Sequence, residues 1–200
     1  MRSVNPWPPS SAPSGGTLAT VLSIFDNFTF GELRAMSKPF ALSPIPNPNP
    51  RTPPQSLLGR ITGLVTYPTL GLQTTSVAYR TDAAIVGRTW GLLQQRRARS
   101  PDVFDYGPNF SFREHMKPRN WLSGILAHVG FLLLGLGLTF RPLRVLASHF
   151  VYQPGEGATA EDAAKDEVEY RAIADPDVEG PVTERAFCRA WYRGGIYYCE

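Results

Sequence analysis

The sequence predicts an α+β fold, in which helices cover an antiparallel sheet and one long apolar helix of the membrane type accompanies them. Residues 167–174 and 183–192 form two strand-like runs separated by a turn-rich connection, which predicts an antiparallel pair. Residues 121–140 contain no Asp, Glu, Lys or Arg. Twenty helical residues rise about 30 Å, the thickness of the hydrocarbon core of a bilayer.

Composition and charge exclude several classes of protein. A hydrophobic fraction of 42% argues against a wholly disordered chain, and two cysteines in 200 residues exclude a disulfide scaffold. The net charge of +3 is unevenly distributed. Residues 1–152 carry 15 basic and 6 acidic side chains, a net +9, whereas residues 153–200 carry 5 basic and 11 acidic ones, a net −6. The first part of the chain is therefore basic and the second part acidic, which predicts different electrostatic surroundings for the two parts.

The elements before the apolar segment follow from local signals. Residues 1–13 are Pro/Ser-rich without a basic, apolar leader pattern, which predicts a disordered lead-in. Apolar spacing predicts helices over Leu18–Phe25 and Phe30–Ser37. Seven prolines in residues 39–54 predict an extended connector over the surface. Leu72–Tyr79 has strand character, and Asp82 is placed as the N-cap of a helix that ends near Leu93.

The apolar segment favours association with a membrane or a lipid surface. Basic residues flank it on both sides, and Trp121 stands at one edge, where interfacial anchors occur. The alternative is the central helix of a soluble core. The basic residues are balanced between the two ends of the segment and therefore indicate no orientation. A full span and a hairpin that enters one leaflet both remain open. His128 is the only ionisable group inside the segment; we expect it to be packed and hydrogen-bonded rather than functional.

Motifs that would carry chemistry are scarce. Gly155–Ala160 fits G-x-G-x-x-A, but Pro154 and Glu156 do not suit a turn that binds pyrophosphate, so no cofactor site is predicted there. The histidines and cysteines show no metal-ligand spacing, and Cys188 and Cys199 are expected to be buried free thiols. Arg96, Arg97 and Arg99 are expected in a solvated loop, because no module that binds nucleic acid accompanies them.

The order of several motifs resembles the saccharopine dehydrogenase-like oxidoreductases, which include the trans-acting enoyl reductases. The resemblance covers roughly residues 14–198. The motifs are S-G-G-T at Ser14–Thr17, K-P-F-A-L-S-P at Lys38–Pro44, D-A-A-I-V-G-R-T-W at Asp82–Trp90, Y-G-P-N-F-S-F-R-E-H-M at Tyr106–Met116, the apolar segment, Q-P-G-E-G at Gln153–Gly157, V-E-Y-R-A-I-A at Val168–Ala174 and R-A-F-C-R-A-W-Y at Arg185–Tyr192.

The resemblance implies an NAD(P)-dependent reductase acting on a lipid-related substrate at a membrane or lipid-droplet surface. Members of the family begin with a Rossmann domain that holds NAD(P), and this chain matches only the middle and C-terminal portion. Hence no cofactor-binding residue and no catalytic residue are assigned, and the chain alone is not expected to catalyse hydride transfer. The substrate-side candidates are Ser14, Gly15, Gly16 and Thr17, for which a helix-starting turn is the structural alternative.

The predicted organisation has four segments. A lead-in over residues 1–13 precedes the first part of the α+β domain over 14–120, which includes the connector 39–54. The apolar membrane-associating segment covers 121–151, and an acidic helix and β-hairpin over 152–200 complete the domain. The expected partners are a membrane or lipid surface and a second copy of the chain, with no nucleic acid and no metal. The compartment would be a lipid droplet, the endoplasmic reticulum or a mitochondrial membrane.

Two rival hypotheses remain open. The chain could be a small membrane-anchored interaction protein without enzymatic activity, using its proline stretch and acidic tail as binding surfaces. Pairing of the 168–192 hairpin with strands near 74–79 and 109–115 would speak against that. A nonfunctional fragment is the third hypothesis, and it predicts an unstable product.

Overall fold

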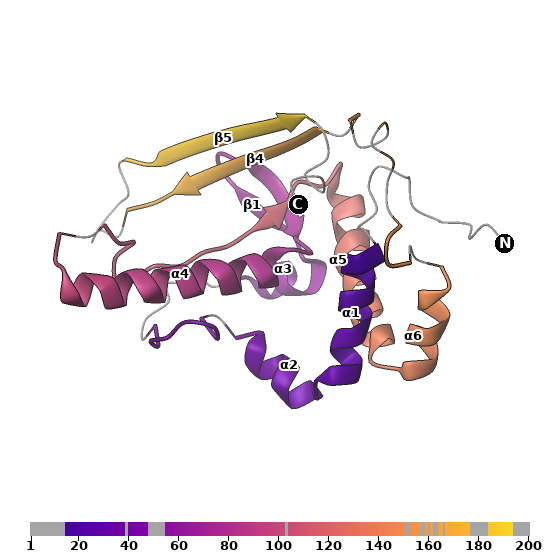
Figure 1. Cartoon of the computed structure of the whole chain (residues 1–200). Coiled ribbons are helices and arrows are strands. Elements are labelled where there is room, and N and C mark those ends of the chain that lie inside the picture. The colour runs from indigo at the N-terminus through magenta and orange to yellow at the C-terminus, as the bar shows by residue number, and fades with distance from the viewer. Residues whose placement is uncertain are drawn as a thin grey trace. The chain divides into compact units, whose positions relative to one another are not determined.

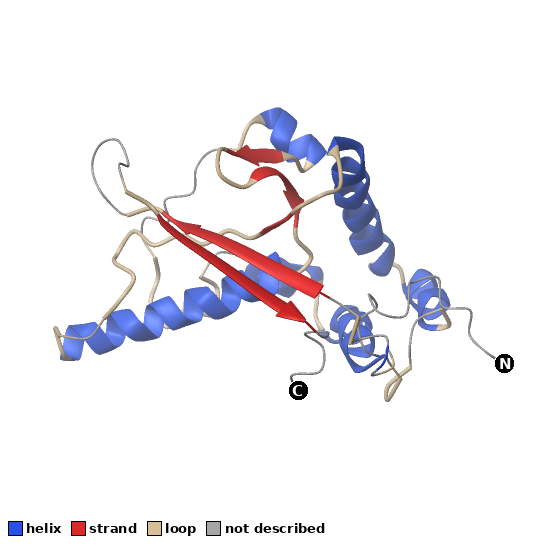
Figure 2. Cartoon of the chain, turned by 90° about the horizontal axis from the view of Figure 1, so that it is seen from above, coloured by secondary structure: helices blue, strands red, loops and turns tan. Residues whose placement is uncertain are grey.

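The computed structural model describes residues 15–38, 40–47, 55–102, 104–150, 153–156, 159, 161, 164–165, 167–176 and 184–193. The chain divides into two compact units. The terminal unit combines Met1–Thr29 with Gly135–Glu200, and the central unit is Phe30–Leu134. Helices and small antiparallel sheets make up the described residues, so the expected α+β class with an apolar helix is confirmed (Figures 1 and 2). The predicted lead-in lies outside the described residues.

The sheet of the central unit has the order β1-β2-β3 and is antiparallel throughout. It consists of β1 (Val65–Tyr67), β2 (Gly71–Thr75) and β3 (His115–Met116). Val65 is the partner of Gln73, and Thr74 is the partner of Met116. The strand expected over Leu72–Tyr79 therefore ends early, because the Ser76 hydroxyl accepts a hydrogen bond from Ala78 N at 3.2 Å and turns the chain toward a helix.

The helix α4 (Tyr79–Arg99) is longer at both ends than predicted (Figure 2). Asp82 lies in its first turn and is not its N-cap. The three arginines expected in a solvated loop instead form its last turn, where positive charge complements the helix dipole. Trp90 in its middle is 2% exposed, and its Nε1 donates to the carbonyl oxygen of Gly107 at 2.8 Å. The Phe40 ring packs edge-on against it at 5.1 Å between centroids.

Three further helices involve the central unit. The helix α2 (Phe30–Met36) lies where it was predicted. The short α3 (Leu57–Thr62) begins at Ser56, whose hydroxyl accepts from Gly59 N at 3.0 Å, and it ends at Gly63 in the left-handed conformation. The apolar α5 (Trp121–Leu138) starts in this unit. Of the predicted proline-rich connector, residues 40–47 are described and residues 39 and 48–54 are not.

In the terminal unit, α1 (Gly15–Asn27) contacts α6 (Arg141–Ser148). Pro142, which as a helix breaker is expected to kink or end the apolar helix, occupies the first turn of α6 and separates this helix from α5. Arg144 of α6 donates through Nη1 to the carbonyl oxygens of Leu138 and Thr139, at 2.8 and 3.1 Å. Its Nη2 binds Asp26 Oδ1 of α1 at 2.6 Å. One guanidinium thus joins the end of α5 to α1.

The terminal unit also holds the predicted hairpin, formed by β4 (Glu167–Ala174) and β5 (Ala186–Arg193). The strands are antiparallel from the pair Glu167 and Arg193 to the pair Ala174 and Ala186 (Figure 1). Among the described residues this sheet has two strands only, and no strand of the β1-β2-β3 sheet pairs with it. Cys188 of β5 is free and exposed, so the expectation of a buried thiol at this position was wrong. Alternate residues of a strand face opposite sides of its sheet, and this sheet has two strands among the described residues. Cys199 lies outside the described residues.

Candidate functional site

The apolar helix α5 and the elements that hold its two ends form one part of the candidate site. Among the described residues, α5 is the one helix long and apolar enough to cross a membrane, and 11% of it is buried. Its side chains are widely exposed: Leu133, for example, is 62% exposed, and so is Trp121 at the first position of the helix. Further exposed apolar side chains of this segment are Leu122, Leu126, Val129, Leu132, Leu134, Leu136 and Phe140.

The first half of α5 is bound to β2 through two consecutive threonines. Thr74, 1% exposed, donates from Oγ1 to the carbonyl oxygen of Gly124 at 2.8 Å. Its neighbour Thr75 forms a 2.7 Å hydrogen bond between Oγ1 and Nδ1 of His128, one helical turn further on. A Cβ on Gly124 would meet Leu64 Cδ2 at 2.6 Å, so a larger residue there would have to displace the Leu64 side chain. His128 is therefore packed and hydrogen-bonded, as expected from the sequence.

A close contact with the α3–β1 connection fixes the His128 ring. Gly63 has a φ of 71°, and a Cβ there would lie 2.3 Å from His128 Cγ. The other ring nitrogen, Nε2, is buried and has no hydrogen-bond partner among the described residues. The sequence signalled this histidine as the lone ionisable group of an apolar helix, but the threonine and glycine that hold it lie more than fifty residues away.

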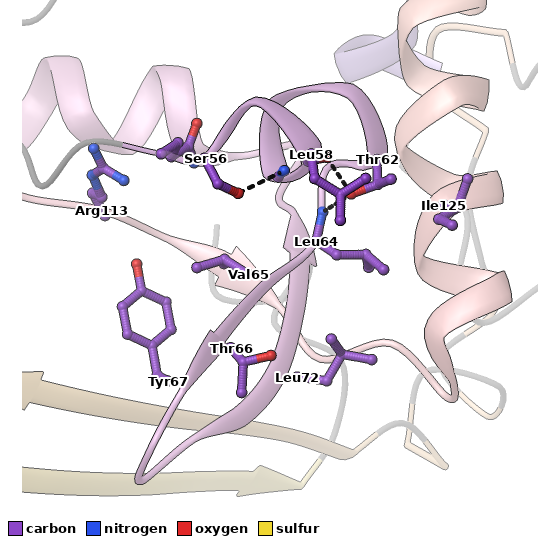
Figure 3. Close-up of a pocket in the computed structure, with 12 residues that line it drawn as sticks. Ser56, Leu58, Thr62, Leu64, Val65, Thr66, Tyr67, Leu72, Arg113 and Ile125 are labelled. Atoms are coloured by element: carbon purple, nitrogen blue, oxygen red, sulfur yellow. Dashed lines mark hydrogen bonds between the residues drawn. The ribbon is translucent and has the colours of Figure 1, made fainter.

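A groove of about 580 Å³ in the central unit forms the second part of the site. This volume is within the range of small-molecule sites. Leu64, Leu72 and Ile125 of α5 line one side, and Arg113 and Tyr67 lie on the other, as Figure 3 shows. The groove is therefore amphipathic, with an apolar wall and a polar end that carries a positive charge. The remaining lining residues are Gln55, Ser56, Leu58, Gly59, Thr62, Val65 and Thr66.

Polar side chains gather next to the polar end of the groove. The Tyr67 hydroxyl is hydrogen-bonded to His115 Nε2 at 3.2 Å, and the two rings are 5.5 Å apart. Burial, and then the positive charge of Arg113, lower the pKa of His115, whereas a backbone hydrogen bond to Thr74 acts in the opposite direction. The imidazole is thus favoured in its neutral form, which can pass a proton to or from the tyrosine hydroxyl.

Glu114, the residue before β3, forms a carboxylate cluster with Asp82. Burial raises the pKa of Glu114, the hydroxyl of Ser76 lowers it through a 2.5 Å hydrogen bond, and the neighbouring Asp82 raises it. From the sequence, no role was predicted for Glu114 or Ser76, and Asp82 was expected only as a helix N-cap. Two sequence features could have indicated this cluster: the doublet Glu114-His115 inside the motif at Tyr106–Met116, and Asp82 in the motif near the start of α4.

The substrate-side candidates from the sequence lie elsewhere. Gly15, Gly16 and Thr17 form the first turn of α1, and Ser14 is outside the described residues. Gly15 N donates to the carbonyl oxygen of Glu156 at 2.9 Å, and a Cβ on Gly15 would overlap the carbonyl of Gln153 at 1.7 Å. The described part of this motif thus starts a helix and permits a close backbone contact. The groove described above is not lined by any of these residues.

Comparisons with known proteins identify no relative. No family model, no curated protein and no solved structure matches this chain.

Proposed function

We propose that this chain is the membrane-associated, substrate-side portion of a saccharopine dehydrogenase-like oxidoreductase. It would bind a lipid-related substrate and would need an NAD(P)-binding Rossmann domain supplied by other sequence to catalyse hydride transfer. The observation that carries the membrane association is the exposed apolar surface of α5. The family assignment depends on the order of sequence motifs.

The energetics favour lipid around α5. A leucine side chain that moves fully out of water gains about 1.5–3 kcal/mol, and the second half of α5 presents Leu132, Leu133, Leu134 and Leu136 as exposed leucines. Lys117 and Arg119 precede the helix, and Arg141 follows it. Basic side chains at these positions attract anionic lipid headgroups, at about 1 kcal/mol each.

Vesicle flotation tests the membrane association. We expect the chain to float with vesicles of phosphatidylcholine and phosphatidylserine, and Leu133→Glu to weaken this binding at least about tenfold, because a carboxylate in the hydrocarbon region costs more than 1.4 kcal/mol. Leu57→Glu is the matched control, since Leu57 is 76% exposed but lies on α3 and outside the groove lining. Complete recovery of the wild-type chain in the soluble fraction without detergent would refute the proposal.

The groove supports a lipid-related ligand. Its apolar wall suits an acyl chain, and the guanidinium of Arg113 suits a carboxylate or phosphate at the head of that chain. The Tyr67–His115 pair stands at the same end. The ligand class that fits is therefore an anionic single-chain amphiphile.

A fluorescent fatty acid, dansylaminoundecanoic acid, can probe the groove. We expect saturable binding that Arg113→Gln weakens about tenfold, because a charge-assisted hydrogen bond contributes about 1.5–3 kcal/mol. Arg60→Gln is the control, since Arg60 lies on α3 but does not line the groove. Equal affinities of the two variants would show that the groove does not bind the carboxylate.

A membrane-anchored interaction protein is the second candidate function. It is favoured by the β4–β5 hairpin, whose aromatic side chains Tyr170, Phe187, Trp191 and Tyr192 are all exposed and which pairs with no third strand among the described residues. Such a protein would float with vesicles but would not bind the fatty-acid probe. The two measurements together therefore separate the two functions.

A further inference from the structure

We propose that α5 enters only one leaflet of the membrane and that both of its ends emerge on the same side. This topology depends on the membrane association proposed above. Of the two topologies that the sequence leaves open, a full span and a hairpin, this proposal selects the hairpin. It follows from three features of the chain: the protein contacts of the first half of α5, the length of its mostly exposed part, and the connection between α1 and α2.

The first half of α5 is bound to protein. Gly124 is buried, its carbonyl oxygen accepts from Thr74, and the His128 ring is bonded to Thr75. Polar backbone and side-chain groups of a sheet thus surround one face of the first two turns. A membrane span must be covered by lipid or by other apolar spans along its length, because irregular backbone is not tolerated against lipid. The first two turns therefore lie at or above the headgroups.

The mostly exposed part of α5 is short. Residues 132–136 are all exposed, which is more than one helical turn, so every side of the helix is accessible in this stretch. Val129 and Gly130 are exposed as well, with the half-buried Phe131 between them and this stretch, so the mostly exposed part spans 129–136. Eight residues rise about 12 Å along the helix axis, far less than the roughly 30 Å of the whole hydrocarbon core.

Chain connectivity excludes a crossing. The end of α5 is bound to Arg144, and Arg144 is bound to Asp26 of α1. If α5 crossed the bilayer, Asp26 would lie on the far side. Phe40, however, packs against Trp90 in the central unit, which holds the beginning of α5.

The segment 27–39 would then have to cross back. It has 13 residues, includes Glu32, Arg34 and Lys38, and ends in a proline. A crossing helix needs about 20 apolar residues, and charged side chains at the membrane centre are costly. Both ends of α5 consequently emerge on the same side.

The helix α6 fits the interface that this topology creates. Leu143 and Leu146 of α6 are exposed and one turn apart, so they form an apolar stripe, and Phe140 and Phe150 beyond its two ends are exposed as well. An amphipathic helix with such a stripe lies in the plane of the interface with its apolar face in the acyl chains.

The topology is tested by counting, for each molecule, how many of two cysteines, one before α5 and one after α6, a membrane-impermeant reagent can reach. A chain with Cys188→Ser and Cys199→Ser receives Arg119→Cys before α5 and His149→Cys after α6; Arg119 and His149 are both exposed. The purified protein is reconstituted into closed vesicles, isolated by flotation and treated with a membrane-impermeant polyethylene-glycol maleimide. We expect every molecule to carry two tags or none, and every molecule to carry two after detergent is added.

The outcomes are distinct. One tag on every molecule would show that α5 spans the bilayer, which overturns the one-leaflet topology and leaves the membrane association intact. A failure to float would overturn both. Oil droplets coated with a phospholipid monolayer provide a second measurement with the unmodified chain: a one-leaflet helix binds them, and a chain that floats with bilayer vesicles but not with these droplets contradicts the proposal.

Discussion

At the residue scale, one histidine shows how an apolar helix can carry an ionisable side chain. His128 is bonded to Thr75 and lies against the backbone of Gly63, so its position is fixed by two residues of the preceding strands. Any side chain at position 63 would occupy the space of the imidazole, and Gly63 also has a backbone conformation that only glycine adopts without cost.

Gly63→Ala should therefore destabilise the central unit more than a left-handed glycine alone would explain. We expect a loss of about 2–4 kcal/mol, which combines about 1–2 kcal/mol for the backbone with about 1–3 kcal/mol for overpacking. Gly71→Ala is the matched control: its φ is 72°, but a Cβ there meets nothing within 4 Å. Urea unfolding followed by circular dichroism measures both, and equal losses would mean that the His128 contact is unimportant.

The half-buried pair of His115 and Tyr67 should make stability depend on pH. The pKa of His115 is held below its usual 6.5 by burial and by Arg113, so the unfolded chain binds more protons than the folded one as the pH falls through 6.5. The free energy of unfolding should decrease from pH 7.5 toward the lowered pKa and then change no further through this group.

His115→Gln should remove this dependence, because glutamine can bond to Tyr67 but does not titrate. Urea midpoints at pH 7.5, 6.5 and 5.5 provide the comparison. A wild-type curve that runs parallel to that of the variant over this range would contradict the expectation.

At the element scale, the attachment of α5 to β2 decides how the apolar helix is presented. The sequence predicted the helix, but nothing local in it indicates that its first half has a polar partner. Thr74 and Thr75 supply that partner because adjacent residues of a strand end can reach successive turns of the helix, at Gly124 and His128.

Thr74→Val should weaken this attachment. The substitution keeps the shape of the side chain and removes the hydroxyl that donates to the carbonyl of Gly124 in a buried place. We expect a loss of about 0.5–1.5 kcal/mol in urea unfolding, the usual net contribution of one hydrogen bond. Thr66→Val on the neighbouring strand is the control, since Thr66 is exposed, and a similar loss there would attribute the effect to β-propensity instead.

At the scale of the whole molecule, the described residues bury little apolar surface. Their buried hydrophobic side chains are Trp90 and Leu138, whereas large apolar side chains on α3, α5, α6 and the β4–β5 hairpin are exposed. A monomer in water rarely presents so much apolar surface without a lipid or protein partner for it. We propose that lipid covers the exposed apolar side chains of α5 and α6.

The whole chain should not bind NADPH tightly. In the proposed assignment this chain lies outside the cofactor domain of the reductase, and the glycines near Gly155 follow a proline and a negative charge rather than a strand. A fluorescence titration of the purified 200-residue chain should show no saturable binding at micromolar NADPH. Saturable binding that Gly155→Ala with Gly157→Ala abolishes would contradict this and locate a nucleotide site at that motif.

The sequence by itself determined the α+β class, the helix α2, the apolar helix α5 with its break at Pro142, and the β4–β5 hairpin, because hydrophobic periodicity, capping residues and proline act within a few residues. The observed ends of β2 and α4 differ from the predicted ones. The Ser76 hydroxyl ends β2 early by accepting a hydrogen bond from Ala78 N, and the helix dipole favours the three arginines that extend the last turn of α4. Only the tertiary structure decided the groove, the Tyr67–His115 pair and the attachment of both ends of α5, since each joins residues far apart in the chain. Such contacts depend on packing between elements, for which a single sequence has no local signal.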